Sequence, residues 1–222
     1  GDVYKRQRVI VVDHHINPSF GDIQVIDSNA ASTTQVLFRE ILSAKIAIDK
    51  NIANCLMTGL ITDTGRFQYS NTDNEVFEIA SKLMLSGAEL TSISDNIYGS
   101  IPLNAIKLQS EVLNRIELYE DEELVVSYVL QEDYQNYNID SSETDFLIDS
   151  IRLVKESNIA LLLKEQQDKS FKGSLRSRNE LDVQQIASLF GGGGHKAASG
   201  FSTNLSMEEI KNKVKNAINS QI

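Results

Sequence analysis

Residues 9–15 of the chain read VIVVDHH, and this stretch decides the fold. A run of β-branched apolar residues is typical of a strand that is buried on both faces of a parallel sheet. The run ends at Asp13, His14 and His15. Because ligands bind at the carboxyl ends of strands in open α/β sheets, these three polar side chains are the first candidates for a functional site.

The rest of the first hundred residues combines a second short strand with helices. The strand is predicted at 23–26, and a helix with one apolar face is predicted over 51–61. Two further helices follow the capping-box patterns STTQ at 32–35 and TDNE at 72–75. Strand signals between helical segments predict α/β layering in this part of the chain.

The pattern changes after Gly99, where Pro102 can open a helix. Beyond that point, strands are predicted over 123–130, 159–164 and 170–176, and helices over 143–154, 182–189 and 207–218. We therefore predict an α/β protein with three parts. These are a partial parallel-sheet domain at 1–100, a helical linker at 101–118, and a smaller α+β domain at 119–222.

Composition excludes several classes of protein. The chain has 222 residues and a formal net charge of −10. Its one cysteine, Cys55, excludes an internal disulfide framework or a cysteine-based zinc site, and we expect a buried thiol. No apolar run reaches the ~18 residues of a membrane span, so a cytoplasmic protein is expected. A surface that grips long duplex nucleic acid needs a basic footprint. Any nucleotide substrate should therefore be small and held in a local pocket with metal ions.

Two segments have the chemistry of a metal site. The carboxylate and two imidazoles of 13–15 are a good donor set for Mn²⁺, Fe²⁺ or Zn²⁺, although an ordinary strand end is the alternative. The second segment, Asp63-Thr64-Gly65, could supply a metal carboxylate or form a plain loop. It also matches the catalytic turn of aspartic proteases, but that fold is all-β, whereas helical spacing precedes Asp63.

A glycine run in the second half is a candidate anion site. Gly191, Gly192, Gly193 and Gly194 precede His195, and backbone N–H groups of such a loop can converge on an anion. It is not a P-loop, because no glycine immediately precedes the following lysine and no Ser or Thr follows that lysine. A flexible linker is the alternative.

The strand predicted just upstream carries Ser174, Arg176 and Arg178. At strand period the two arginines share a face, and two guanidiniums on one face suit bidentate binding of phosphate. The alternative is a solvated strand face.

Together, these segments resemble the DHH phosphoesterases that carry a C-terminal DHH-associated domain. The short two-domain layout is most similar to the nanoRNase/pAp phosphatase branch of that family. The resemblance rests on VVDHH at 11–15, NAAST at 29–33, GLITDTGRF at 59–67, GSLRS at 173–177 and the glycine-rich segment 191–201.

This resemblance implies a hydrolase that acts on short single-stranded RNA or on pAp-type nucleotides. A cyclic-di-AMP or linear di-adenylate phosphodiesterase and a non-catalytic nucleotide-binding fragment are the alternatives. The resemblance also implies two Mn²⁺ ions, or Mg²⁺ or another divalent cation, with His14 and Asp63 as ligands. It places Asp13 near the metals, His15 against the scissile phosphate, and Arg176, the glycine run and His195 in substrate binding.

The family's first two metal motifs lie upstream of the strand at which this sequence begins. We therefore expect four ligands to be missing, this chain to be inactive by itself, and residues 1–8 to be foreign to the family. The sequence leaves the oligomeric state open, a homodimer included.

Overall fold

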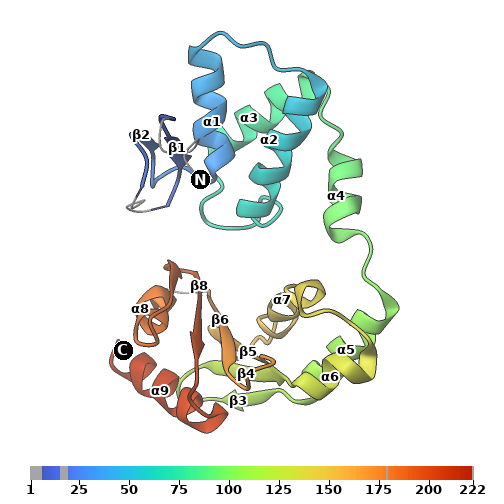
Figure 1. Ribbon diagram of the computed structural model, residues 1–222, viewed down its shortest axis with the longest axis vertical. Helices are drawn as coiled ribbons and strands as arrows, with labels where there is room; N and C mark the ends of the chain where they lie inside the picture. The colour runs from blue at the N-terminus through green and yellow to red at the C-terminus, as the bar shows by residue number, and fades with distance from the viewer. Residues whose placement is uncertain (1–6, 16–19, 179, 222) are drawn as a thin grey trace. The chain divides into compact units, whose positions relative to one another are not determined.

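The computed structural model describes residues 7–15, 20–178 and 180–221 (Figure 1). Of the segment 1–8, which we expect to be foreign, 1–6 lie outside the described residues. The chain divides into two compact units, Gly1–Ser100 and Ile101–Ile222. None of the helices described in either unit is long and apolar enough to cross a membrane.

In the first unit, two short parallel strands stand beside four helices. The strands are β1 (Ile10–Asp13) and β2 (Ile23–Ile26), with Ile10 opposite Ile23. The helices are α1 (Thr33–Ser43), α2 (Lys50–Asp63), α3 (Asn74–Leu85) and α4 (Leu90–Tyr98). Both predicted strands are present, but burial of β1 on both faces was wrong, because Ile10 is 62% exposed. Only β2 pairs with β1 in the described part of the chain, so this sheet has two strands there.

Side-chain caps fix where the first three helices begin. Ser32, Asp49 and Asp73 each accept a hydrogen bond from a backbone N–H in the first turn of the helix that follows. The apolar face of α2, which includes Met57 and Leu60, is buried against α1 and α3. Cys55 is exposed on the opposite side, which corrects the expectation of a buried thiol.

A six-stranded sheet forms the centre of the second unit, in the order β3-β4-β5-β6-β8-β7. Its strands are β3 (Glu117–Tyr119), β4 (Leu124–Val129), β5 (Ile159–Glu165), β6 (Phe171–Ser177), β7 (Gly193–His195) and β8 (Ala198–Thr203). Strands β4 and β5 are parallel, and the other neighbours are antiparallel. The helices are α5 (Leu103–Asn114), α6 (Gln131–Tyr137), α7 (Leu147–Ile151), α8 (Val183–Ser188) and α9 (Met207–Asn219), with a 3₁₀ turn at Ser141–Thr144.

Helices cover the two faces of this sheet unequally (Figure 1). On one face, Leu161 and Leu175 pack in a core with residues of α8 and α9. On the other face, Ala160 and Leu162 pack in a second core with residues of α5 and α7. This second core contains residues of β4 and β5 but none of β6, β8 or β7. The residues of those last three strands on the second face are half-buried or exposed, although α7 also contacts β6.

The segment predicted as a helical linker contains a helix, α5, whose buried Ala105, Leu108 and Val112 pack against the second unit's sheet. Two other expectations about the second half need correction. The helix expected over 143–154 is divided between the 3₁₀ turn and the short α7. The glycine run is not a loop throughout, because its last two glycines and His195 form β7.

An ion pair under the sheet generates a prediction about stability. Arg115 donates to both carboxylate oxygens of Asp133, at 2.6 and 2.9 Å, and Leu130 N–H donates to the same carboxylate. Burial by itself raises the pKa of Asp133, but these hydrogen bonds outweigh burial and lower it. We expect Asp133→Asn to reduce the free energy of unfolding by about 2 kcal/mol or more at pH 7.

Urea unfolding at several pH values checks this prediction. A carboxyl whose pKa is lowered in the folded state stabilises the fold above its unfolded pKa of about 3.9 and loses that effect as the pH falls through the folded pKa. The difference between wild type and variant should therefore shrink below about pH 4. The control is Asp149→Asn, which removes a half-exposed ion pair with Arg152 and should cost less than about 1 kcal/mol. Equal losses in the two variants would contradict the prediction.

Candidate functional site

The carboxylate of Asp13, at the end of β1, organises the polar cluster of the first unit. Its Oδ1 accepts hydrogen bonds from the backbone N–H of His14 at 2.7 Å, from Thr33 Oγ1 at 3.0 Å and from His15 Nδ1 at 2.8 Å. Burial raises the pKa of Asp13, but the bonds from His15, His14 and Thr33 outweigh burial and hold the pKa well below its usual range. The carboxylate is therefore ionised, and His15 Nδ1 is the donor of its pair.

The His14 ring is held in one orientation. Its side chain is 11% exposed, and its Nδ1 lies 3.2 Å from the carbonyl oxygen of Ala30. Because a carbonyl oxygen only accepts, Nδ1 carries the proton in this contact. The other nitrogen, Nε2, lies 3.7 Å from Asp63 Oδ2. A carbonyl oxygen that accepts from one ring nitrogen and so fixes the tautomer is typical of histidines that ligate metals through the other nitrogen.

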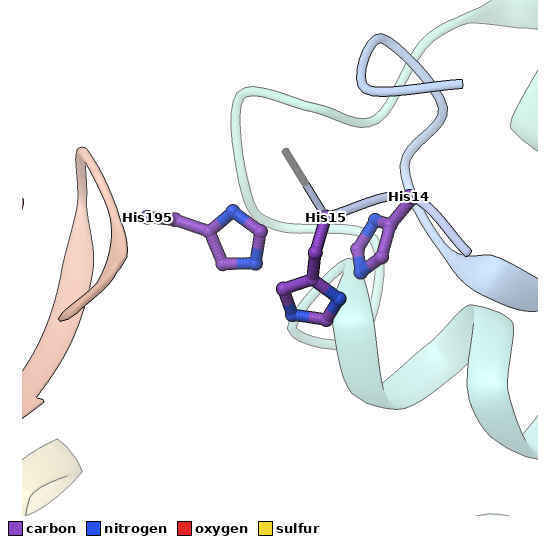
Figure 2. Close-up of side chains that lie close together, drawn as sticks. All are labelled: His14, His15 and His195. Atoms are coloured by element: carbon purple, nitrogen blue, oxygen red, sulfur yellow. The ribbon is translucent and has the colours of Figure 1, made fainter. Parts of the chain in front are cut away.

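His15 lies directly beside this ring (Figure 2). The centroids of the His14 and His15 rings are 4.6 Å apart, with an edge-to-face angle of 79°. The side chain of His15 is 57% exposed, whereas that of His14 is largely buried. The two neighbouring imidazoles are therefore inequivalent, and His15 is the one that solvent or a substrate can reach.

Asp63 is the last residue of α2, so the plain-loop interpretation of this segment was wrong. The negative end of the helix dipole adds to its carboxylate, which favours a cation at this position. The side chain of Asn71 donates to the backbone oxygens of both Asp63 and Ala31, and thereby joins the end of α2 to the segment before α1. The aspartic-protease interpretation was also wrong, because Asp63 ends a helix in an α/β unit.

The turn after Asp63 explains the Thr-Gly pair. Thr64 is completely buried, and its hydroxyl donates to the carbonyl oxygen of Leu60. Gly65 has a φ of +55°, and a Cβ there would lie 2.3 Å from the ring of Tyr69. Only glycine fits this turn without a rearrangement, so the turn fixes the orientation of the end of α2.

A divalent cation fits between His14 and Asp63. Bonds of about 2.1 Å to a shared ion allow two ligand atoms to lie up to about 4 Å apart. The 3.7 Å separation of His14 Nε2 and Asp63 Oδ2 is within this limit. The two residues therefore lie as close together as ligands of one ion must. The neutral imidazole and the carboxylate also have the chemistry that Mn²⁺ or Zn²⁺ prefers.

Sequence reasoning gave no role to three residues that hold this cluster together. Thr33 supports Asp13, the carbonyl of Ala30 supports His14, and Asn71 supports Asp63. The capping box at 32–35 located the start of α1, and the register of that helix is what places Thr33 beside Asp13. No local signal marks Asn71, because its partners are distant in sequence.

The second unit brings its candidate residues onto one row of the sheet. Ala198 of β8 is paired with Arg176 of β6 on one side and with His195 of β7 on the other. Cross-strand partners project from the same face of a sheet, so Arg176 and His195 flank the small side chain of Ala198. The next row on this face consists of Ser174, Gly200 and Gly193. The side chain of His195 projects from the β7–β8 hairpin (Figure 2).

Glycine is required at some positions of this hairpin by close packing, but not at others. A Cβ at Gly192 would lie 2.2 Å from the carbonyl oxygen of Gly200, and one at Gly194 would lie 2.6 Å from that of Ala198. These two glycines allow the strands to approach each other. A Cβ at Gly193 or Gly191 would meet nothing within 4 Å, so close packing does not explain them. Gly193 leaves open space on the row that it shares with Ser174.

The two arginines are held by backbone oxygens. Arg176 donates to the carbonyl oxygen of Leu175 at 3.0 Å. Arg178 lies just beyond β6 and donates to the carbonyl oxygen of Val154 at 3.3 Å. Neither guanidinium has a carboxylate within 4 Å among the described residues, whereas Arg39 and Arg115 are both paired with carboxylates. Their positive charge therefore remains available to an anion.

Comparison with known proteins identifies the domain in the second half of the chain. Residues 121–221 match the model of the DHHA1 domain. The chain is also 31% identical over 216 residues to the bifunctional oligoribonuclease and PAP phosphatase NrnA of Thermus thermophilus, across 96% of this chain and 64% of that protein. The second half of the chain is therefore a DHHA1 domain, and the chain is similar to the branch of the DHH family that includes NrnA.

Other relatives agree with this similarity. A probable NrnA of Streptococcus mutans is 27% identical over 194 residues, which cover 86% of this chain and 61% of that protein. The crystal structure of an exopolyphosphatase-related protein from Bacteroides fragilis superimposes with a TM-score of 0.86 at 27% identity, over 97% of this chain and 64% of that one. The chain therefore spans less than two thirds of the length of the relatives that it matches.

Mn²⁺ binding tests the cluster at the end of β1. We expect His14→Ala and Asp63→Asn each to weaken binding of Mn²⁺ about tenfold or more, since even loss of a residue behind a metal ligand costs ~10–100-fold. Titration followed by electron paramagnetic resonance near pH 7.5 measures the free ion directly. The control is Glu78→Gln, which removes an exposed carboxylate on α3. Equal affinity in all four proteins would show that this pair holds no metal.

Proposed function

We propose that the protein containing this chain is a metal-dependent phosphoesterase that hydrolyses short oligoribonucleotides and pAp-type nucleotides. The observation that carries the proposal is the fixed pair at the end of β1, where Ala30 directs His14 Nε2 toward Asp63 Oδ2. The relatives named bifunctional oligoribonuclease and PAP phosphatase support this substrate class.

In this proposal, His14 and Asp63 hold a divalent cation, with Mn²⁺ as the first choice and Mg²⁺ as an alternative. When bound, such an ion supplies Lewis-acid chemistry at a phosphoryl oxygen and lowers the pKa of a bound water. Asp13 keeps His15 Nδ1 protonated and thereby fixes the ring that faces the scissile phosphate. The catalytic assignments of Asp13 and His15 belong to this proposal.

In this proposal, residues of the second unit bind the phosphate of the substrate. Arg176 offers two parallel N–H donors to a phosphate, and His195 on the same row offers a further donor. Ser174 and Gly193 of the next row leave the surface low enough for a ligand to lie on it, and Arg178 adds positive charge. Gly192 and Gly194 contribute by letting β7 approach β8. This local charge offsets the net charge of −10 and suits a short single strand.

The same substrate class and the lone thiol of Cys55 support a cytoplasmic location within this proposal. A homodimer is compatible with it. A di-adenylate phosphodiesterase would use the same groups, and a substrate panel separates the two activities. A non-catalytic nucleotide-binding role is the second candidate, because His14 and Asp63 provide two protein ligands for a single cation position.

Hydrolysis by the 222-residue chain is the first test of these alternatives. We expect little or no Mn²⁺-dependent release of nucleotide from pAp or a dinucleotide, since two protein ligands cannot position two ions against competition from water. Turnover is measured beside a full-length relative under the same conditions. Rates comparable with that relative would mean that other residues of this chain supply the ligands.

Nucleotide binding by the second unit is the next test. We expect Arg176→Ala and His195→Ala each to weaken binding of a 5′-phosphorylated dinucleotide to the whole chain. Loss of a charge-assisted contact costs roughly 1.5–3 kcal/mol, or about 10- to 150-fold in affinity. Isothermal titration calorimetry measures the change. Lys107→Ala removes an exposed positive charge on α5 and should bind like wild type. If wild type binds and both variants match it, the anion site is assigned to the wrong residues.

A further inference from the structure

A second concave site lies on the second unit, away from the Arg176–His195 row. It is a cavity of about 830 Å³ between α6 and the turn that joins β5 to β6. The residues that matter for its chemistry are Gln131, Tyr134, Gln135, Gln167, Asp168 and Ser202. We call it the α6 cavity. None of the groups assigned to metal or phosphate lines it.

The α6 cavity contains hydrogen-bonding groups that the fold does not use. Tyr134 is only 8% exposed, and its hydroxyl makes no well-formed hydrogen bond among the described residues, although the side chain of Thr144 lies near it. Burial raises the pKa of Tyr134 to about 12, so the phenol keeps its proton at neutral pH. A buried hydroxyl without a well-formed hydrogen bond carries an uncompensated desolvation cost, which a ligand with an acceptor atom would relieve.

Three more neutral groups around Tyr134 are unused. The carboxamides of Gln135 and Gln167 and the hydroxyl of Ser202 are exposed, and they form no hydrogen bond with other described residues. Each carboxamide offers both donors and an acceptor, and the hydroxyl can act in either sense. The α6 cavity can therefore recognise a ligand that presents donors and acceptors side by side.

The charges at this site disfavour phosphate. Asp140 and Asp168 line the α6 cavity, and hydrogen bonds from Ser142 and Ser170 lower the pKa values of their carboxyl groups. No lysine or arginine is among its lining residues. Two carboxylates and several neutral amides suit an uncharged ring with exocyclic N–H groups, such as adenine, better than they suit an anion.

One face of the sheet connects this cavity to the phosphate row. Ser202 lies on β8 four residues from Ala198, with Gly200 between them, so all three face the same side. Four residues of a strand span about 13 Å. Exposed Lys172 is the cross-strand partner of Ser202 on this face, and the row between that pair and Arg176 consists of the small residues Ser174 and Gly200. A single phosphate cannot reach both ends, whereas a chain of several nucleotides can.

We propose that the α6 cavity binds the base of a downstream nucleotide in an oligoribonucleotide whose phosphate is held at Arg176 and His195. The inference rests on the proposed function, because it assumes that the Arg176–His195 row holds the phosphate. It distinguishes the two kinds of substrate in that function. A mononucleotide such as pAp occupies the phosphate row alone, and only a longer substrate gains the second contact.

Binding of matched ligands to the whole chain tests the inference. The ligands are the mononucleotide pA, the tetranucleotide pAAAA, and the same tetranucleotide with abasic sugars at its last two positions. We expect wild type to bind pAAAA about three- to tenfold more tightly than the abasic form, which is the effect of one or two neutral hydrogen bonds. Tyr134→Phe and the double variant Gln135→Ala/Gln167→Ala should reduce this preference for bases. Neither variant should change the affinity for pA.

The variants are chosen to keep the fold. Tyr134→Phe removes only a hydroxyl that makes no well-formed hydrogen bond within the described structure, and Gln135 and Gln167 are exposed. Asn136→Ala is the matched control, because Asn136 is the exposed neighbour of Gln135 on α6 and does not line the cavity. A wild type that binds the intact and abasic tetranucleotides equally would overturn the inference, as would an unchanged preference in both variants.

Nuclear magnetic resonance separates failure of the inference from failure of the proposed function. With pAAAA added to the ¹⁵N-labelled chain, we expect shifts at residues 193–195 and also at 131–141, 166–170 and 202. Shifts confined to 193–195 would keep the phosphate row and overturn the α6 cavity as a base site. Shifts at 131–141 without shifts at 193–195 would overturn the connection between the two sites. Shifts in neither region would overturn the proposed function and the inference that rests on it.

Discussion

The carboxylate of Asp13 is the fixed point on which the polar cluster of the first unit depends. It accepts hydrogen bonds from His14 and His15, the two residues that follow β1, and from Thr33 in the first turn of α1. These bonds keep it ionised, and an ionised Asp13 sets the tautomer of His15. The carbonyl oxygen of Ala30 sets the tautomer of His14. The two adjacent imidazoles after β1 therefore differ in which partner fixes their protons.

The second unit uses a different principle, which is incomplete coverage of a sheet. Helices α5 and α7 bury one face mainly over β4 and β5, and α7 also contacts β6. The same face over β6, β8 and β7 carries Arg176 and His195 on one row and small residues on the next. Glycine permits this arrangement, because Gly192 and Gly194 let β7 approach β8 where a Cβ would collide with a carbonyl oxygen.

Charge is arranged so that an acidic chain can still bind an anion. Arg39 and Arg115 are paired with carboxylates and stabilise the fold, whereas Arg176 has no carboxylate partner in the part of the chain that is described. The α6 cavity, at the other end of the sheet face, has two carboxylates and no basic lining residue. Lys172, the cross-strand partner of Ser202, adds a positive charge to that end of the face, so the carboxylates are confined to the cavity itself.

The sequence by itself determined the strands at 10–13 and 23–26, the capped helices and the chemically distinctive segments, because these depend on local patterns of apolar residues and caps. It also indicated that His14 and Asp63 belong together. Only the tertiary structure decided that Thr33, Ala30 and Asn71 support them, because those contacts join residues far apart in the chain. The same holds for the glycine run, which pairs as a strand, and for α5, which joins the second unit through its buried face.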